Sequence, residues 1–309
     1  MTGKSNRPYR AGVCTVTPFD EAGRLDEHGI EDMVERIAGA GVSLAIGTAS
    51  PGEGHALSLD ETARFFDIVV RVNAGRVSIC AMGVEPRNDG QLQPLIRLAE
   101  QAKLDTMQLY TVDPGHAMSL NEGEHERYFA TMLDSMTIPA TISTHAFNGL
   151  VPLPVLSRLL DHYPNISAIH CTSEVNYLLR LLEIVDDRCE ILVGGPMQAL
   201  SVHALGGNGF LSSEGILAPV LLGELQSALR AGDLAAAEIS YRKVIGLFAL
   251  NIWPGASLRY IKAAMRILGM PGGYTRPPFE ALDPAAIPVL VSALKKLALP
   301  EHEGKISAG

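Results

Sequence analysis

Two short apolar segments end in side chains that could move protons. In "NISAIHCTSE", residues 165–174, strand alternation places His170 on the same face as the small inner residues. In "IPATISTHAFN", residues 138–148, Ser143 and His145 share one face of a second predicted strand. An imidazole titrating near neutrality acts as general acid or base, and a hydroxyl can donate to a substrate oxygen. We therefore predict His170, Ser143 and His145 as catalytic residues.

Each of these three residues also has a structural interpretation. A buried histidine is commonly a hydrogen-bonded packing residue, and His145 could cap a loop. A nucleophilic pair of Ser143 and His170 is conceivable, but no orienting carboxylate accompanies it. The place of the two strands in the fold decides between these interpretations.

A repeated unit positions these strands: a short apolar run, a polar or Gly-rich loop, and a segment of helical period. "SLDE" at Ser58–Glu61 has the pattern of a helix-capping box, and Gly41 and Gly206 are expected to close helices. Strands that alternate with helices predict right-handed parallel crossovers. The predicted strands are residues 12–19, 43–47, 77–83, 105–110, 138–144, 165–171, 190–195 and 207–213.

Eight such units predict an α/β fold of the (β/α)₈ TIM-barrel type with additional C-terminal helices. A doubly wound sheet is the rival, but no G-x-G-x-x-G motif follows the first strand. We expect a barrel over residues 1–230 and a helical extension over 231–309, packed on the barrel as one structural unit. Chemistry in a barrel gathers at the C-terminal ends of the strands, where His170 is predicted to lie.

Composition excludes several classes of function. The 309 residues are 47% hydrophobic, and the net charge is -9 with scattered basic residues, so no nucleic-acid partner is expected. The longest apolar runs are broken by lysines, and "MTGKSNRPYR" lacks a signal-peptide core, so we expect a cytoplasmic protein without a membrane partner. Three of the four cysteines fall in apolar strand-like runs and are expected to be reduced core thiols.

Several segments, in order, resemble the dihydrodipicolinate synthase / N-acetylneuraminate lyase family. They are "GVCTVTPFDEAGRLDEHGI", "GTASPGEGHALSLDE", "GGNGFLSS" and "SLRYIKAAMRILGM". The resemblance covers nearly the whole chain. It implies a barrel that binds pyruvate-like 2-oxo acids and assembles as a homo-oligomer, a dimer or a tetramer of tight dimers. The expected partner is a small-molecule carboxylate or 2-oxo acid, and no cofactor is expected.

The chain departs from the family at the residues that carry its chemistry. In the family the sixth strand presents a lysine that forms a Schiff base, and here the matching residue is His170, which cannot supply a primary amine. Ser143 stands at the family's tyrosine, Asn148 lies near its arginine, and the Asp113–Pro114 region replaces its tyrosine pair. The lysines, none of which falls at a predicted strand end, are Lys4, Lys103, Lys243, Lys262, Lys295, Lys296 and Lys305. Schiff-base catalysis is therefore not expected.

The resemblance also implies a carboxylate-binding loop, "GTASPGE", at residues 47–53. Its backbone N–H groups and the hydroxyls of Thr48 and Ser50 could hold a carboxylate, while its glycines could equally serve the turn alone. Glu53 matches the family's loop glutamate and could be structural. The predicted substrate-binding residues are Gly47, Thr48, Ser50, Glu53, Asn148, Ser212 and Ser213.

A metal site is not expected. Four histidines could border the barrel mouth, but they come from different loops and show no H-x-H or H-E-x-x-H spacing. They are His55, His116, His145 and His170.

The leading hypothesis is a lyase, a carbon–carbon lyase or a hydro-lyase, that acts on a small 2-oxo or carboxylated substrate without a Schiff base. His170 would be its general acid/base. The alternative is a non-catalytic binding or regulatory relative that keeps a carboxylate pocket. A third possibility, an introduced substitution at His170, is disfavoured by the concurrent changes at Ser143 and Asn148.

Overall fold

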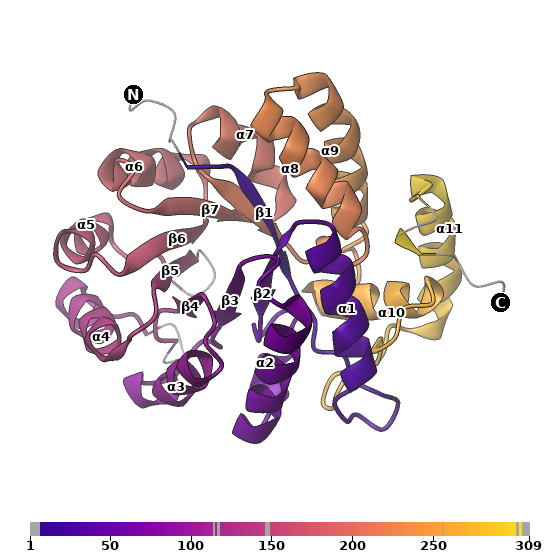
Figure 1. Ribbon diagram of the computed structural model, residues 1–309, viewed down its shortest axis with the longest axis horizontal. Helices are drawn as coiled ribbons and strands as arrows, with labels where there is room; N and C mark the ends of the chain where they lie inside the picture. The colour runs from indigo at the N-terminus through magenta and orange to yellow at the C-terminus, as the bar shows by residue number, and fades with distance from the viewer. Residues whose placement is uncertain are drawn as a thin grey trace. The chain divides into compact units, whose positions relative to one another are not determined.

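The strands form a closed parallel barrel in sequence order, from β1 to β8 (Figure 1). This computed structural model describes residues 7–113, 115, 118–145, 149–254, 256–300 and 303–304. The strands are β1 (Arg10–Cys14), β2 (Ser43–Ile46), β3 (Ile79–Met82), β4 (Thr106–Leu109), β5 (Ala140–His145), β6 (Ile166–Thr172), β7 (Glu190–Gly194) and β8 (Gly209–Ser212). The predicted (β/α)₈ barrel is confirmed.

Helices follow the strands and continue beyond the last one. They are α1 (Glu27–Gly39), α2 (Leu59–Asn73), α3 (Gln93–Gln101), α4 (Glu122–Ser135), α5 (Leu153–His162), α6 (Val175–Val185), α7 (Ala199–Ala204), α8 (Pro219–Ala231), α9 (Leu234–Phe248), α10 (Ala256–Ile267) and α11 (Ile287–Leu297). The additional C-terminal helices are thus confirmed. The division at residue 230 stays a prediction.

By its contacts the chain falls into two compact units. Unit 1 comprises residues 1–10 and 79–211, and unit 2 comprises residues 11–78 and 212–309. In unit 1, α4, α5 and α6 lie side by side outside β5 and β6, each helix contacting the next (Figure 1).

The pairing of β5 with β6 fixes which side chains share a face. Ser143 is the Cα partner of His170, so both point to the same side of the sheet. The neighbouring Thr144 points to the other side, where its hydroxyl lies 2.9 Å from the Tyr177 hydroxyl of α6. Ser143 and His170 therefore face away from the covering helices and into the barrel.

Gln108 of β4 belongs to the same inner face. It is the Cα partner of Thr141, which lies two residues before Ser143 on β5. Its amide side chain is fully buried, between the apolar residues Met107 and Leu109 of the strand. Three adjacent strands of unit 1 thus present polar side chains to one interior.

In unit 2 the predicted helix signals take the expected form. The Ser58 side chain accepts from the Glu61 backbone N–H, and the Glu61 carboxylate accepts from the Ser58 N–H, which confirms the capping box of α2. Gly41, which follows α1, adopts a positive φ of 69°. β1 differs from the predicted strand 12–19. It ends at Cys14, four residues before Pro18, which has no N–H to donate.

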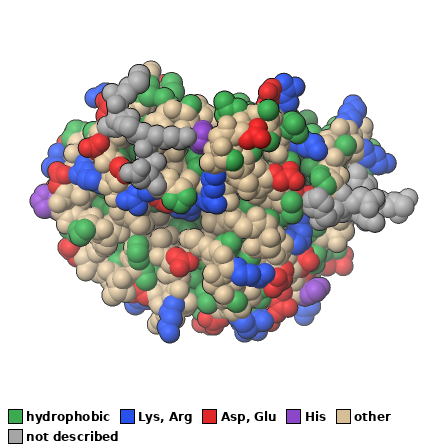
Figure 2. Space-filling view, turned by 45° about the horizontal axis from the view of Figure 1, so that its top comes forward, with side chains coloured by type: hydrophobic (Ala, Val, Ile, Leu, Met, Phe, Trp, Pro, Cys, Tyr) green, Lys and Arg blue, Asp and Glu red, His purple; other side chains and the backbone are tan. Residues whose placement is uncertain are grey.

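Within the described part of the chain, no helix is long and apolar enough to cross a membrane. On the face shown in Figure 2, basic and acidic side chains intermix and no large area carries one sign of charge.

Candidate active site

His170 lies on β6 with 6% of its surface exposed. Its Nδ1 lies 3.2 Å from Oε1 of Gln108. An amide oxygen can only accept, so Nδ1 carries the hydrogen and donates it to Gln108. The other ring nitrogen, Nε2, then presents a lone pair, and it has no hydrogen-bond partner among the described residues.

Burial controls the charge of this imidazole. Burial lowers the pKa of His170 to about 3, and the positive potential of His145 and Arg10 acts in the same direction. The sequence led us to expect titration near neutrality. The structure instead favours a neutral ring, because burial disfavours the charged form.

Two more buried polar atoms beside His170 lack partners. Within the described residues, neither Oγ of Ser143 nor Nε2 of Gln108 makes a hydrogen bond. An unsatisfied buried donor or acceptor costs about 1–3 kcal/mol. We call Gln108, Ser143 and His170 the unpaired cluster. Its unpartnered atoms are Nε2 of Gln108, which donates, Oγ of Ser143, which donates or accepts, and Nε2 of His170, which accepts.

The backbone at position 194 packs against the imidazole. A Cβ placed on Gly194 would lie 3.2 Å from Nε2 of His170 and 2.0 Å from Oγ1 of Thr172. Such a contact forces a shift, so only glycine fits this backbone. The side chains of Thr172 and His170 thus require a glycine at this point of β7.

His145, the third predicted catalytic residue, is the last residue of β5 and is half-buried. Burial lowers its pKa, and the Glu85 carboxylate partly opposes that effect. It lies on the same face of the strand as Ser143, one alternation further on. Asn148, predicted to bind substrate, lies outside the described residues.

The predicted carboxylate loop in unit 2 is a tightly closed turn. Gly47 has a positive φ of 78°, and a Cβ on Gly54 would lie 2.1 Å from the Gly47 carbonyl oxygen. The Thr48 hydroxyl donates to the Ser50 carbonyl at 3.3 Å, while the Ser50 residue is exposed. The glycines are thus required by the turn itself, whatever the loop binds.

Glu53 is fully buried and engaged within the protein. One carboxylate oxygen accepts from the Arg276 backbone N–H at 2.9 Å, and the other pairs with Lys262. With both oxygens engaged, Glu53 anchors the loop rather than contacting a ligand directly. The sequence left open whether Glu53 binds substrate or is structural, and its contacts favour the structural role.

Lys262 comes from α10 and is 1% exposed. Its ammonium donates to the carbonyls of Thr17 at 2.9 Å and Tyr274 at 2.6 Å, and pairs with Glu53. Burial lowers its pKa to about 8, although the Glu53 carboxylate opposes that shift. We call Lys262, Glu53 and Arg276 the paired cluster, in which all three lysine donors are used.

Ser212, predicted as a substrate donor, is committed elsewhere. Its hydroxyl donates to Oε2 of Glu214 at 3.0 Å, and the Tyr260 hydroxyl donates to Oε1 at 3.0 Å. Burial raises the pKa of the Glu214 carboxyl, and the hydrogen bonds from Ser212 and Tyr260 act against that shift. Ser213 is half-buried just after β8.

No three His, Cys, Asp or Glu side chains of the described residues gather as metal ligands. The ring of His55 packs edge-on against Phe279 at 5.6 Å between centroids. His116 lies outside the described residues.

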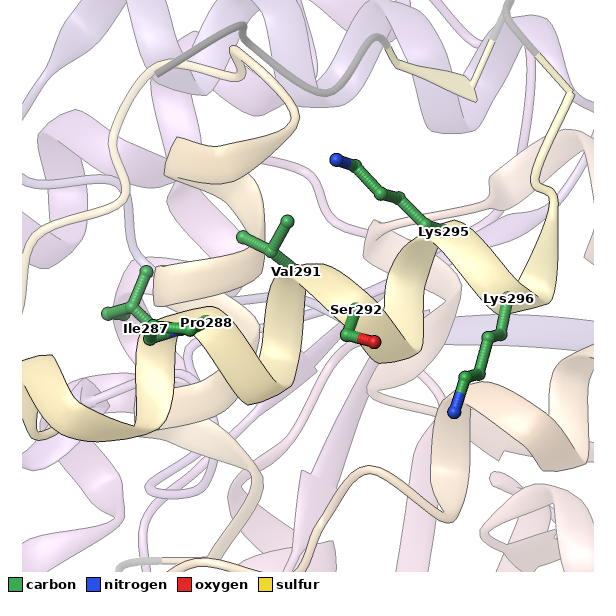
Figure 3. Close-up of a pocket in the computed structure, with 6 residues that line it drawn as sticks. All are labelled: Ile287, Pro288, Val291, Ser292, Lys295 and Lys296. Carbon is green, nitrogen blue, oxygen red and sulfur yellow. The ribbon is translucent and has the colours of Figure 1, made fainter.

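A surface hollow of about 640 Å³ lies along α11 in unit 2. Figure 3 shows Lys295 and Lys296 pointing to opposite sides of the helix, so their amines do not converge on one ligand. A binding site for a small polar molecule needs convergent polar groups, which this hollow lacks. Its lining residues are Ile287, Pro288, Val291, Ser292, Lys295 and Lys296.

Three groups were missed from the sequence. Gln108 could have been identified from the sequence, because an amide between two apolar residues of a predicted strand needs a hydrogen-bond partner when it is buried. Lys262 was noted only as a helical lysine, and no local pattern links it to Glu53. Glu214 directly follows a predicted strand, which is where barrel enzymes place their reactive groups.

The fold and this interior define the class: a (β/α)₈ barrel whose polar side chains lie on inward-facing positions of adjacent strands. The Dihydrodipicolinate synthetase family matches residues 9–297, and the chain belongs to that family. The predicted family resemblance is confirmed.

Similar proteins agree in fold over almost the full length. The 4-hydroxy-tetrahydrodipicolinate synthase of Chlorobium phaeobacteroides (strain BS1) is 26% identical over 293 residues, 94% of this chain and 97% of that protein. The synthase of the same name from Acidiphilium cryptum (strain JF-5) is 28% identical over 290 residues, 93% of this chain and 97% of that protein. The solved structure of YagE, a prophage protein of this family from E. coli K12 in complex with pyruvate, superposes with a TM-score of 0.87 at 23% identity, covering 94% and 99% of the two chains.

Proposed function

We propose that this protein is a lyase that acts on a small 2-oxo or carboxylated substrate without forming a Schiff base. The observation that carries the proposal is the unpaired cluster of Gln108, Ser143 and His170. Three buried polar atoms without partners on adjacent strands cost about 3–9 kcal/mol together, counted at 1–3 kcal/mol each. A ligand with matching oxygen atoms recovers that cost, and lyase chemistry is what membership of the family favours.

A carbon–carbon cleavage uses the three groups in distinct roles. Nε2 of His170 takes the proton of a substrate hydroxyl, the carbon–carbon bond breaks, and the hydroxyl carbon becomes a carbonyl. The electron pair of that bond passes to an enolate oxygen, which accepts hydrogen bonds from Gln108 and Ser143. The imidazolium then returns its proton to the enolate carbon, so that atoms and charge balance.

The low pKa of His170 fits this role only when an anion is present. A base with a pKa of about 3 is poorly matched to proton removal at neutral pH. The enolate that develops beside the ring during the reaction favours the imidazolium and raises that pKa. The substrate thus supplies the negative charge that the protein leaves out.

We do not propose a mechanism in which a lysine amine forms a Schiff base with the substrate. The position on β6 holds His170, and the buried Lys262 of α10 has its ammonium engaged by two carbonyls and a carboxylate. The loop at residues 47–53 stays a proposed carboxylate-binding segment, through the backbone N–H groups near Gly47 and the hydroxyls of Thr48 and Ser50. Ser213 and Asn148 stay proposed contacts, and His145 a proposed assistant.

A non-catalytic binding protein is the second candidate. The observation that favours it is the depressed pKa of His170, which suits a hydrogen-bond acceptor better than a proton carrier. Assembly as a homo-oligomer and a place in the cytoplasm also remain proposals. Light scattering of the purified chain tests the assembly.

The test begins with a thermal-shift panel of 2-oxo and hydroxy acids, followed by turnover assays on each binder. The lyase proposal predicts turnover of at least one binder, lost in His170→Ala while binding persists. Binding without turnover of any acid supports the non-catalytic alternative, and failure of every acid to bind contradicts both. Borohydride treatment with pyruvate should give no covalent mass shift, and an adduct would contradict the amine-free route.

A further inference from the structure

The hydrogen-bond pattern around His170 specifies more than a polar ligand. Gln108 meets the ring through its amide oxygen, which leaves Nδ1 as the donor and Nε2 as the acceptor. The ring is neutral, so Nε2 carries no second hydrogen. Any ligand atom beside Nε2 must therefore bring its own hydrogen.

The backbone of β7 comes close to the same nitrogen, because a Cβ placed on Gly194 would lie 3.2 Å from Nε2. The remaining free atoms of the unpaired cluster, Nε2 of Gln108 and Oγ of Ser143, can both donate. The complementary ligand has one hydroxyl donor next to oxygen atoms that accept.

We propose that Gln108 is a positioning residue that fixes the Nδ1–H tautomer of His170, so that the site selects an acid carrying a hydroxyl over its oxo analogue. The inference rests on the proposed function only in taking the ligand to be a small acid. A carbonyl oxygen facing the Nε2 lone pair would set two acceptors against each other and leave both unpaired. Sites built to bond a hydroxyl discriminate strongly against analogues that lack it.

The first measurement reads the tautomer directly. Long-range ¹H–¹⁵N correlation spectra of ¹⁵N-histidine-labelled protein, with the His170 signals assigned by their loss in His170→Ala, should show a protonated Nδ1 and an unprotonated Nε2. A protonated Nε2 would overturn the inference whether or not any acid binds.

The second measurement compares matched acids by calorimetric titration: lactate with pyruvate, and 2-hydroxybutyrate with 2-oxobutyrate. The hydroxy acid of each pair should bind at least about tenfold more tightly, which corresponds to about 1.4 kcal/mol. Equal binding, or tighter binding of the oxo acids, would overturn the inference while leaving the proposed function intact. Absence of all binding would contradict the proposed function instead, and the tautomer would still be decided by the spectra.

Two variants separate positioning from simple packing. Gln108→Met keeps the length of the side chain but removes the amide oxygen, so the hydroxy-to-oxo affinity ratio should fall toward one and the tautomer should become mixed. Gln108→Glu keeps an oxygen that accepts from Nδ1–H but raises the pKa of His170, so the ratio should persist at pH values where the same spectra show a neutral ring, even if the absolute affinity of both acids drops. A ratio that survives in Gln108→Met would contradict the role of Gln108.

Discussion

The paired cluster and the unpaired cluster are two solutions to burying polar groups. Lys262 and Glu53 carry full charges, yet the lysine donors and both carboxylate oxygens are engaged. Gln108, Ser143 and His170 are neutral, yet each leaves one polar atom without a partner in the described structure. A complete set of partners serves stability, whereas missing partners are a cost that a ligand can remove. The paired cluster of unit 2 thus anchors a loop, and the missing partners in unit 1 are the reason for proposing a site there.

Breaking the paired cluster should have the largest effect. Lys262→Met leaves the Glu53 carboxylate buried without its cation, and we expect a loss of about 3–5 kcal/mol in the free energy of unfolding. Denaturant unfolding measures it, with the exposed Lys296→Met as a matched control that should change little. The double variant Lys262→Met/Glu53→Gln should recover part of the loss. A single variant as stable as the parent would show that the cluster is not an anchor.

The loss of stability at acidic pH tests whether His170 of the unpaired cluster is buried and neutral. His170 has a folded pKa of about 3, below its usual 6.5, so the unfolded chain binds the extra proton more readily. Its contribution to stability is therefore fully present above pH 6.5 and is lost as the pH falls toward 3, by up to about 1.4 kcal/mol per pH unit. Between pH 3 and 7, the free energy of unfolding should change less steeply with pH for His170→Asn than for the parent. Identical slopes would contradict a buried, neutral imidazole.

Crowding the imidazole at position 194 tests whether a ligand binds beside Nε2. Gly194→Ala places a methyl group against Thr172 and His170, and overpacking of this kind costs about 1–3 kcal/mol. Acid binding, measured by calorimetry, should be lost at temperatures where the variant is still folded. Gly39→Ala at the end of α1, where a Cβ meets nothing within 4 Å, is the control and should be neutral or slightly stabilising. Unchanged acid affinity in Gly194→Ala would place the ligand elsewhere.

Ser143→Ala should have the smallest effect on stability. Its effect on acid binding should be clear. Removing a buried hydroxyl that has no partner should leave the free energy of unfolding within about 1 kcal/mol of the parent, or raise it. Acid affinity should nevertheless fall. Ser43→Ala offers the contrast, because its hydroxyl donates to the Ala11 carbonyl at 2.9 Å and its removal should cost about 1 kcal/mol. If Ser143→Ala is the more destabilising of the two, its hydroxyl has a structural partner and the cluster is not a site.

The fold could be predicted from the sequence because its signals are local. Alternation, helical period and a capping box at Ser58–Glu61 each depend on a few neighbouring residues. Alternation grouped His170 with the small inner residues of its strand, and the register places Ser143 on the same face. The partner of a buried group is different, because Gln108 and His170 meet only when β4, β5 and β6 assemble.

The electrostatics of the site lay beyond the sequence for the same reason. The pKa of His170 depends mainly on the burial of the ring, and the neighbouring residues in the sequence do not indicate how deeply the ring is buried. Glu53 and Lys262 come from distant segments, so their pairing depends on how the loop and α10 pack. Residue types and faces could thus be predicted, while partners and charge states required the structure.

The most direct test of the account is a crystal structure of the protein soaked with the tightest-binding acid of the panel. We predict a ligand hydroxyl about 3 Å from Nε2 of His170, with ligand oxygens at similar distances from Nε2 of Gln108 and Oγ of Ser143. A ligand joined covalently to a lysine nitrogen, or one bound away from β4, β5 and β6, would contradict it.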